Sequence, residues 1–266
     1  MSKLTKEECL ARGIPWHDIK HRMTRRAFWR DYWRAGEYGI TIHLNMGEDG
    51  SVEKSMLLSA VVGDCNARPP YCVLNGSLPN LEGNTTLLVE GGLDASCGCE
   101  GDARLPDNEG YPRTKLTALG RLVDACLRTM GTHKLDGDVR LGRYVIMPTH
   151  IHATLIVERD LPMHTYRGKQ VRVTLSDVVR GFEQGCTSWW YRLLEGESVD
   201  EILAEPRKRR ASVAPPTLEG REAPSLWNSD GFNDSILYNA ERKHNWVLYV
   251  LQNAYFWRLE QVIRSC

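Results

Sequence analysis

The sequence predicts an α+β fold, in which an antiparallel sheet has helices packed on one face and an irregular β-rich segment is inserted into the domain. Two observations predict this class. Apolar and polar residues alternate, as in half-buried strands, at residues 37–45, 139–147 and 150–158. Apolar residues recur with helical spacing at residues 114–133, 174–196 and 236–265. A chain with both patterns can bury one face of its sheet under its helices.

The length and composition indicate one soluble domain that carries an insertion. The 266 residues contain 42% hydrophobic and 26% charged side chains, which is ordinary for a globular protein. No apolar run approaches the roughly 18 to 20 residues that a membrane span needs. Residues 1–13 lack the apolar core of a signal peptide, so we expect a cytoplasmic protein without a membrane partner. Its eight cysteines are then expected to be reduced thiols.

Charge divides the chain into three parts, although its net charge is zero. Residues 1–44 hold 9 basic and 5 acidic side chains and form a basic and aromatic arm that leads into the first strand. Residues 45–113 hold 4 and 11, and their many turn-forming residues predict an acidic insertion of short strands. Residues 114–266 hold 21 and 18 and are expected to form the main part of the domain. A modestly basic body with an acidic appendage leaves DNA binding open.

Local signals place the ends of the helices and the connections between them. Thr117 is expected to cap the first helix and Ser176 the second. The second helix is expected to bury its apolar stripe, which consists of Val178, Val179, Phe182, Trp189 and Leu193. The charged, proline-bearing residues 195–224 are expected to form a mobile loop.

Two histidines open the strand at residues 150–158. His150 and His152 share one face of that strand, with Cα atoms about 6–7 Å apart, so both rings can reach one ion. The alternatives from spacing alone are two polar residues on a solvated face, or a single packed histidine. A second candidate metal motif, Cys97–Cys99 with Cys65 and Cys72, is a weak zinc signal in a glycine-rich stretch.

The text around the histidines, YVIMPTHIHATLIV at residues 144–157, resembles the core motif of the HUH endonuclease superfamily. It is most similar to the single-tyrosine transposases and their REP-associated relatives, which carry histidine, a hydrophobic residue and histidine at this place. The chain has Thr149 where that family usually has asparagine.

A second motif, NWVLYVLQNAYFW at residues 245–257, resembles the tyrosine helix of the same family. Tyr249 and Asn253 are four residues apart, so a helix places them on one face about 6 Å apart. The chain differs from the family pattern at three positions: Ala254 is where the family usually has proline, Asn228 where it usually has glutamine, and Glu183 where it often has lysine. The resemblance covers roughly residues 30–44 and 114–258, and leaves the insertion unmatched.

The resemblance implies a fold, a reaction and a partner. The fold would be the ferredoxin-like or RRM-like HUH nuclease core, with residues 114–266 as the main part of the catalytic domain. Mg²⁺ or Mn²⁺ would be held by His150, His152 and Asn253, and Tyr249 would attack single-stranded or hairpin DNA to form a 5′-phosphotyrosine. The reaction would serve DNA transposition or repeat mobilisation. Some relatives are homodimers that exchange their tyrosine helices, and others act as monomers.

Several interpretations stay open at the level of sequence. The candidate phosphate contacts are Arg25, Arg26, Arg30, Arg167, Lys169 and Arg172, and the basic run Arg207, Lys208, Arg209 and Arg210 is a further candidate. Ordinary solvated charge is as good an interpretation for each of them. No dedicated base for the tyrosine is evident. The same histidines could serve a hydrolase without a covalent step, and a domesticated hairpin-DNA-binding protein without turnover would keep the fold.

Overall fold

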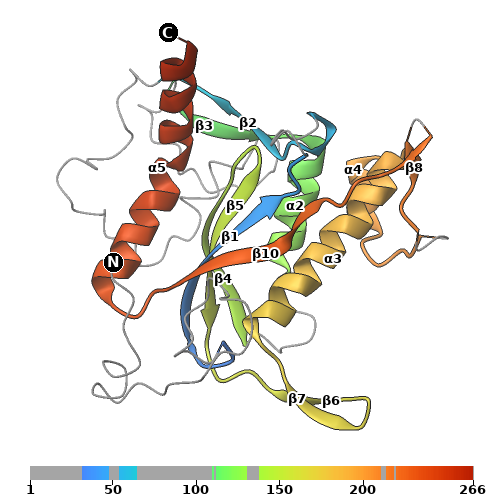
Figure 1. The fold of residues 1–266 in the computed structure, drawn as a ribbon, viewed down its shortest axis with the longest axis vertical. Coiled ribbons are helices and arrows are strands. Elements are labelled where there is room, and N and C mark those ends of the chain that lie inside the picture. Colours follow the sequence, from blue (N-terminus) through green and yellow to red (C-terminus); the bar gives the residue numbers. More distant parts are fainter. Residues whose placement is uncertain are drawn as a thin grey trace.

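The computed structural model describes residues 32–47, 54–64, 110, 112–130, 138–210, 214–218 and 220–265. Its centre is a four-stranded antiparallel sheet with strand order β10-β1-β5-β4 (Figure 1). The strands are β1 (Gly36–Leu44), β4 (Val139–Ile146), β5 (His150–Val157) and β10 (Trp227–Ile236). An antiparallel sheet combined with helices confirms the predicted α+β class.

The edge strand β10 is the element of this sheet that the sequence does not predict. Its sequence, WNSDGFNDSI, consists mostly of turn-forming and polar residues, which are depleted in strands. It becomes a strand because β1 offers its free edge, and it pairs with β1 from Ile236 opposite Tyr38 to Trp227 opposite Leu44. Tertiary pairing here overrides local propensity.

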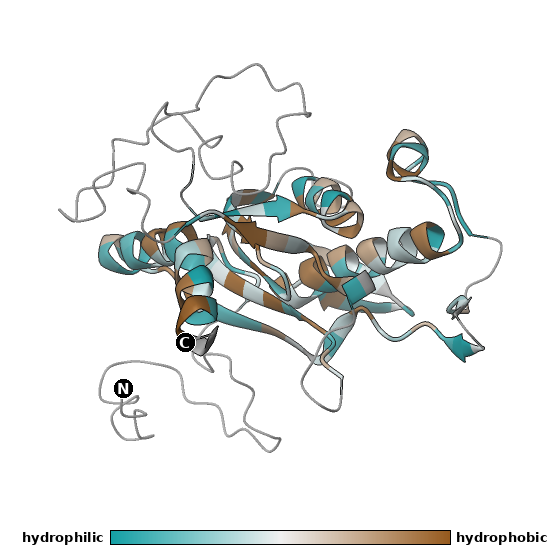
Figure 2. Ribbon diagram, turned by 90° about the horizontal axis from the view of Figure 1, so that it is seen from above, coloured by the Kyte–Doolittle hydropathy of each residue, from teal (hydrophilic) through white to brown (hydrophobic). Residues whose placement is uncertain are grey.

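Alternate residues of the central strands face opposite sides of the sheet. One side, the apolar face, carries Tyr38, Ile40, Ile42, Ile151, Ala153 and Leu155, all fully buried. The other side, the polar face, carries Thr41, His43, His150, His152 and Thr154. The same two strands therefore provide both a hydrophobic core and a polar surface, and Figure 2 shows the hydrophobic segments along the central strands.

Two helices, α2 (Ala118–Arg128) and α3 (Leu175–Leu194), cover the apolar face. As predicted, Thr117 caps α2, and its side chain accepts a hydrogen bond from the backbone N–H of Gly120. The prediction of Ser176 as the cap of α3 is wrong. The cap is Thr174, whose backbone N–H donates to the Asp177 carboxylate, so the capping box begins two residues earlier.

The buried stripe of α3 differs from the prediction at the tryptophans. Trp190 is the fully buried one and lies one turn after the buried Cys186, whereas Trp189 and Leu193 are only partly buried. Trp189 instead donates its indole N–H to the carbonyl of Pro206. Because two tryptophans are adjacent, the sequence does not show which of them belongs to the buried stripe, and the packing of α3 in the core against α2 decides it.

The last helix, α5 (Ala240–Ser265), lies across the polar face, on the side of the sheet opposite to α2 and α3 (Figure 1). The expectation that helices pack on one face therefore holds for α2 and α3 but not for α5. Trp246 of α5 sits so close to Gly39 that a Cβ there would come within 2.6 Å of the indole ring. A glycine in β1 thus lets α5 approach the sheet.

The beginning of the acidic segment 45–113 belongs to the main core. Met56, in the short helix η1 (Lys54–Met56), and the following Leu58 are buried in the same cluster as the central strands. Strand β2 (Ser59–Val62) pairs with β3 (Arg113–Leu116), which joins the two ends of the segment. Residues 65–109, with the cysteine motif considered for zinc, lie outside the described residues.

Short strand pairs and one short helix lie at the periphery of the domain. The polar connection after β5 is a hairpin, β6 (Met163–Tyr166) and β7 (Lys169–Arg172), and a two-residue pair joins β8 (Thr217–Leu218) to β9 (Arg221–Glu222). The stretch expected to be a mobile loop, 195–224, contains this second pair and α4 (Val199–Ala204). A Ser198–Glu201 capping box and the burial of Ile202 explain the helix. No helix among the described residues has an apolar stretch long enough to cross a bilayer.

Candidate active site

The two histidines of β5 lie together on the polar face, beneath α5. Their ring centroids are 4.6 Å apart, and His152 is only 3% exposed. The strand periodicity predicted that they share a face, and α5 is what removes them from solvent. His150 is partly buried, and burying imidazoles costs free energy unless their nitrogens find partners.

Both ring nitrogens of His152 have partners. Nδ1 lies 2.8 Å from Oγ1 of Thr41 on the neighbouring strand, and Nε2 lies 3.1 Å from the hydroxyl oxygen of Tyr249 on α5. A neutral imidazole has one N–H and one lone pair, so one contact uses the ring as donor and the other as acceptor. No base near Tyr249 is evident from the sequence, whereas in the structure His152 Nε2 lies beside its hydroxyl.

Burial keeps both histidines neutral. Together with the neighbouring His150 and His43, it lowers the pKa of His152 to about 3. Burial and His43 likewise lower the pKa of His150 to about 4, against a hydrogen bond with Asn253 that raises it. At neutral pH each ring therefore keeps a lone pair, which a proton or a metal ion can take.

Helix α5 brings the other two predicted residues to the histidines. Asn253 is buried, 8% exposed, and its side chain hydrogen-bonds with His150. Tyr249, one turn earlier, is 45% exposed, with its ring centroid 4.8 Å from that of His152. The helix is anchored by Val250, which packs with Val145 and Met147 of the sheet. The four residues selected from two distant motifs thus meet in one place.

Four further side chains that the sequence reasoning did not select complete the cluster: Thr41, His43, Trp246 and Trp257. His43 lies 5.6 Å from His150 between ring centroids, and its Nε2 is 3.4 Å from the amide nitrogen of Asn233 on β10. Trp246 donates its indole N–H to Oγ1 of Thr154 at 3.1 Å. The alternation of β1 already put Thr41 and His43 on one face, but only the pairing of β1 with β5 shows that this face adjoins the histidine pair.

The donor set fits a divalent ion in its chemistry. His150 and His152 offer neutral nitrogens and Asn253 an amide oxygen, a mixed set of the kind that suits Mn²⁺ better than Mg²⁺. No group of three or more His, Cys, Asp or Glu in a metal-binding arrangement occurs among the described residues, so an ion here would depend on the amide. Because both nitrogens of His152 are engaged, an ion would have to replace one of its two hydrogen bonds.

Of the six candidate phosphate contacts in the N-terminal arm and in the loop after β5, those that the structure describes are not brought to the histidines. Arg25, Arg26 and Arg30 lie outside the described residues. The other three belong to the β6–β7 hairpin, beyond the end of β5 opposite to His150 (Figure 1). Arg172 stacks over Trp33 at 4.2 Å and donates to the carbonyl of Leu161, which is a packing role. Arg167 and Lys169 are exposed near the hairpin turn.

Another tyrosine of the histidine motif is excluded as a partner of this site. Tyr144 is buried on the apolar face, and its hydroxyl donates to the Asp124 carboxylate at 2.6 Å. Burial together with that carboxylate raises its pKa far above the usual range. It therefore packs the sheet against α2.

Comparisons with known proteins add no relative to these observations. No protein-family model matches the chain, and neither a curated protein nor a solved structure matches it.

Proposed function

We propose that this protein is a metal-dependent endonuclease and strand transferase for single-stranded DNA, of the single-tyrosine HUH type, acting in transposition or repeat mobilisation. The observation that carries the proposal is the contact between the Tyr249 hydroxyl and His152 Nε2, at 3.1 Å. It joins the predicted nucleophile to the predicted metal-binding pair, although 97 residues separate them. Asn253, one turn further, supports it by its contact with His150.

The reaction would be an in-line displacement at phosphorus. The Tyr249 oxygen forms a bond to the scissile phosphorus, the bond from phosphorus to the 3′ oxygen breaks, and that oxygen leaves as a hydroxyl after taking up a proton. The product is a 5′-phosphotyrosine, which conserves the phosphodiester bond for rejoining by a second 3′-hydroxyl. The partial exposure of Tyr249 gives a phosphate access to its oxygen from outside the sheet.

The other residues of the polar face would bind the metal ion and orient its ligands. His150, His152 and Asn253 would hold a divalent ion, which supplies Lewis acidity toward the non-bridging phosphate oxygens. Thr41 orients His152 through its contact with Nδ1. Since His152 has a single lone pair, it cannot hold an ion and accept the phenolic proton at once, so that proton would leave to solvent.

The test is a gel assay for a covalent adduct. Single-stranded hairpins cut from the repeats that flank this gene, labelled at the 5′ or the 3′ end, are incubated with Mn²⁺ or with EDTA. We expect an SDS-resistant adduct that carries the DNA downstream of the nick, requires Mn²⁺ and is absent in Tyr249→Phe. Tyr255→Phe, six residues later on the same helix, is the matched control and should retain the adduct.

Two outcomes would replace the proposal. Metal-dependent cleavage that survives Tyr249→Phe would mean hydrolysis without a covalent step. Tight hairpin binding with no adduct would favour a DNA-binding protein without turnover. One observation favours this second candidate: both ring nitrogens of His152 are satisfied by Thr41 and Tyr249, so the cluster is complete as a packing arrangement without an ion.

A further inference from the structure

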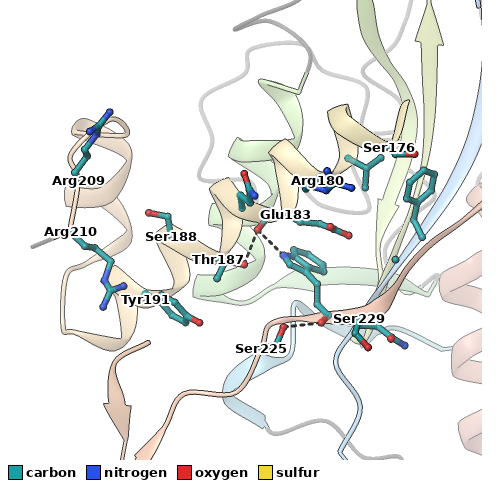
Figure 3. A pocket seen from close by; sticks show the side chains of 16 residues that line it. Ser176, Arg180, Glu183, Thr187, Ser188, Tyr191, Arg209, Arg210, Ser225 and Ser229 are labelled. Carbon is teal, nitrogen blue, oxygen red and sulfur yellow. Dashed lines mark hydrogen bonds between the residues drawn. The ribbon is translucent and has the colours of Figure 1, made fainter. Parts of the chain in front are cut away.

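A groove lined by both polar and apolar side chains lies between α3 and β10. It has a volume of about 740 Å³, within the roughly 300–1,000 Å³ typical of ligand sites. Arg180, Glu183 and Thr187 of α3 form one wall, and Ser225 and Ser229 lie across from them (Figure 3). We call it the α3–β10 groove. It lies outside the histidine cluster, and none of the roles proposed above uses it.

Glu183 is the unusual residue of the groove. Its Oε1 atom is buried and has no hydrogen-bond partner among the described residues. Burial raises the pKa of this carboxyl to about 6, against the effect of the nearby Arg180. A buried acceptor left unpaired is costly, and such groups are rare in folded proteins. A ligand that donates hydrogen bonds would relieve that cost.

The rest of the lining suits a nucleotide. The Trp227 indole donates to the backbone carbonyl of Glu183 at 3.1 Å, which fixes an aromatic ring beside the carboxyl. At the other end of the groove, Tyr191 lies under the Arg210 guanidinium at 4.9 Å, next to Arg209 (Figure 3). Aromatic rings accept stacked bases, and arginines attract phosphates. Because Arg210 already pairs with the Glu195 carboxylate, Arg209 is the arginine placed to attract a phosphate here.

The groove and the histidine cluster share β10. Phe232 lines the groove, while the next residue, Asn233, reaches His43 on the polar face. Among the described residues β10 is the edge strand of this sheet, so a single strand of DNA that crosses this edge would contact both places. Double-stranded DNA would be too wide to place one base in the groove without unpairing it.

Resting on the function proposed above, we propose that the α3–β10 groove binds one unpaired guanine of the single-stranded substrate, whose Watson–Crick edge donates to the Glu183 carboxylate. A carboxylate only accepts hydrogen bonds. Guanine presents two adjacent donors on that edge, N1–H and the 2-amino group. Adenine and cytosine present one donor beside an acceptor, and thymine presents one donor between two acceptors. Guanine is therefore the base that best matches an ionised carboxylate.

The test measures binding of short oligonucleotides that are unable to form hairpins. Fluorescein-labelled heptamers of thymidine, with guanine, inosine, adenine or thymine at the central position, are titrated into the full chain by anisotropy. We expect the guanine heptamer to bind roughly 5- to 150-fold more tightly than the all-thymine one. Inosine, which lacks the 2-amino group, should lie between them.

Two variants test whether Glu183 is the residue that recognises the guanine base. Glu183→Gln should lose the guanine preference, because an amide replaces one acceptor by a donor. Glu158→Gln is the matched control: it makes the same chemical change at an exposed ion pair with Arg140, at the far end of the sheet, and should keep the preference. A central 6-thioguanine, irradiated, should cross-link to a peptide from α3 or β10.

The outcomes separate this inference from the proposed function. A wild-type protein that binds all four heptamers equally would overturn the guanine groove, as would a preference that persists in Glu183→Gln or cross-links that map elsewhere. The Tyr249 adduct assay would be untouched by those results. Conversely, a Glu183-dependent guanine preference without any adduct would support the groove while rejecting the strand transferase.

Discussion

The apolar and polar faces of the central sheet are made by alternate residues of the same strands, yet they are buried by different means. On the apolar face, Ile42, Ile151 and Leu155 are fully buried under α2 and α3, whose own apolar stripes fill the layer. On the polar face, His152 is almost as buried, but its neighbours are a threonine, a tyrosine and a tryptophan.

Because the two faces are buried by different means, they contribute differently to folding stability and to chemical reactivity. Burying aliphatic side chains contributes free energy of folding roughly in proportion to the area removed from water. Burying imidazoles costs free energy unless each nitrogen is paired, and here it also lowers both histidine pKa values. Side chains on the apolar face should therefore govern unfolding, and those on the polar face should govern reactivity.

The largest expected effect tests the apolar face. Leu155→Ala removes a fully buried side chain and leaves a cavity, so the free energy of unfolding should fall by about 2–5 kcal/mol. Urea denaturation measures this, and adduct formation by the remaining folded protein should be unchanged.

The variant of the polar face to compare with Leu155→Ala is His150→Ala. Its loss of stability should be smaller, about 1 kcal/mol, because the ring is buried at a cost, whereas adduct formation should fall at least about a hundredfold. A larger loss of stability in His150→Ala than in Leu155→Ala would contradict the division between the faces.

The next effect tests how α5 reaches the polar face. Gly39→Ala places a Cβ within 2.6 Å of the Trp246 ring, so α5 must shift, which should cost about 1–3 kcal/mol and reduce adduct formation. Thermal unfolding and the gel assay measure the two consequences. The control is Gly181→Ala in α3, where nothing lies within 4 Å of the added Cβ and stability should rise by about 0.5–1 kcal/mol. Equal behaviour of the two variants would mean that Trp246 does not set the position of α5.

The strands and helices with clean periodicity were predictable from sequence. The alternation in β1 and β5 and the apolar repeats in α2 and α3 reflect burial on one side, which is what periodicity records. β10 and the side of the sheet on which α5 packs were not predictable, because both depend on partners distant in sequence.

The candidate site shows the same limit. Two motifs select Tyr249, His150, His152 and Asn253, and the structure brings these four together. Thr41 and His43 escape selection because their importance comes from lying opposite His152 and His150 in the β1–β5 register. A strand pattern tells which face a residue occupies, but not which residue of another strand lies beside it.

Thr41 therefore offers a sharper test of the polar face. Thr41→Val removes the oxygen that contacts His152 Nδ1 and keeps the shape of the side chain, so affinity for Mn²⁺ should fall roughly 10- to 100-fold. Calorimetric titration of the full chain with Mn²⁺ measures the change. Thr165→Val, on the peripheral hairpin, is the control and should bind Mn²⁺ as the wild type does. Unaltered affinity in Thr41→Val would mean that Thr41 does not orient a metal ligand.

The smallest expected effect concerns the pH dependence of stability set by Glu183. Because burial raises the pKa of its carboxyl from 4.5 to about 6, the folded protein holds this proton more tightly than the unfolded chain. The resulting stabilisation is complete below pH 4.5 and is lost as the pH rises through 6. Glu183→Gln lacks the titration, so its melting temperature relative to wild type should rise across that window, by about 2 °C or less since the carboxyl is partly solvated. A difference that stays constant from pH 4.5 to 7.5 would show that water already satisfies this carboxylate. Glu183 Oε1 would then not be unpaired, and there would be no reason to expect a hydrogen-bond-donating ligand in the α3–β10 groove.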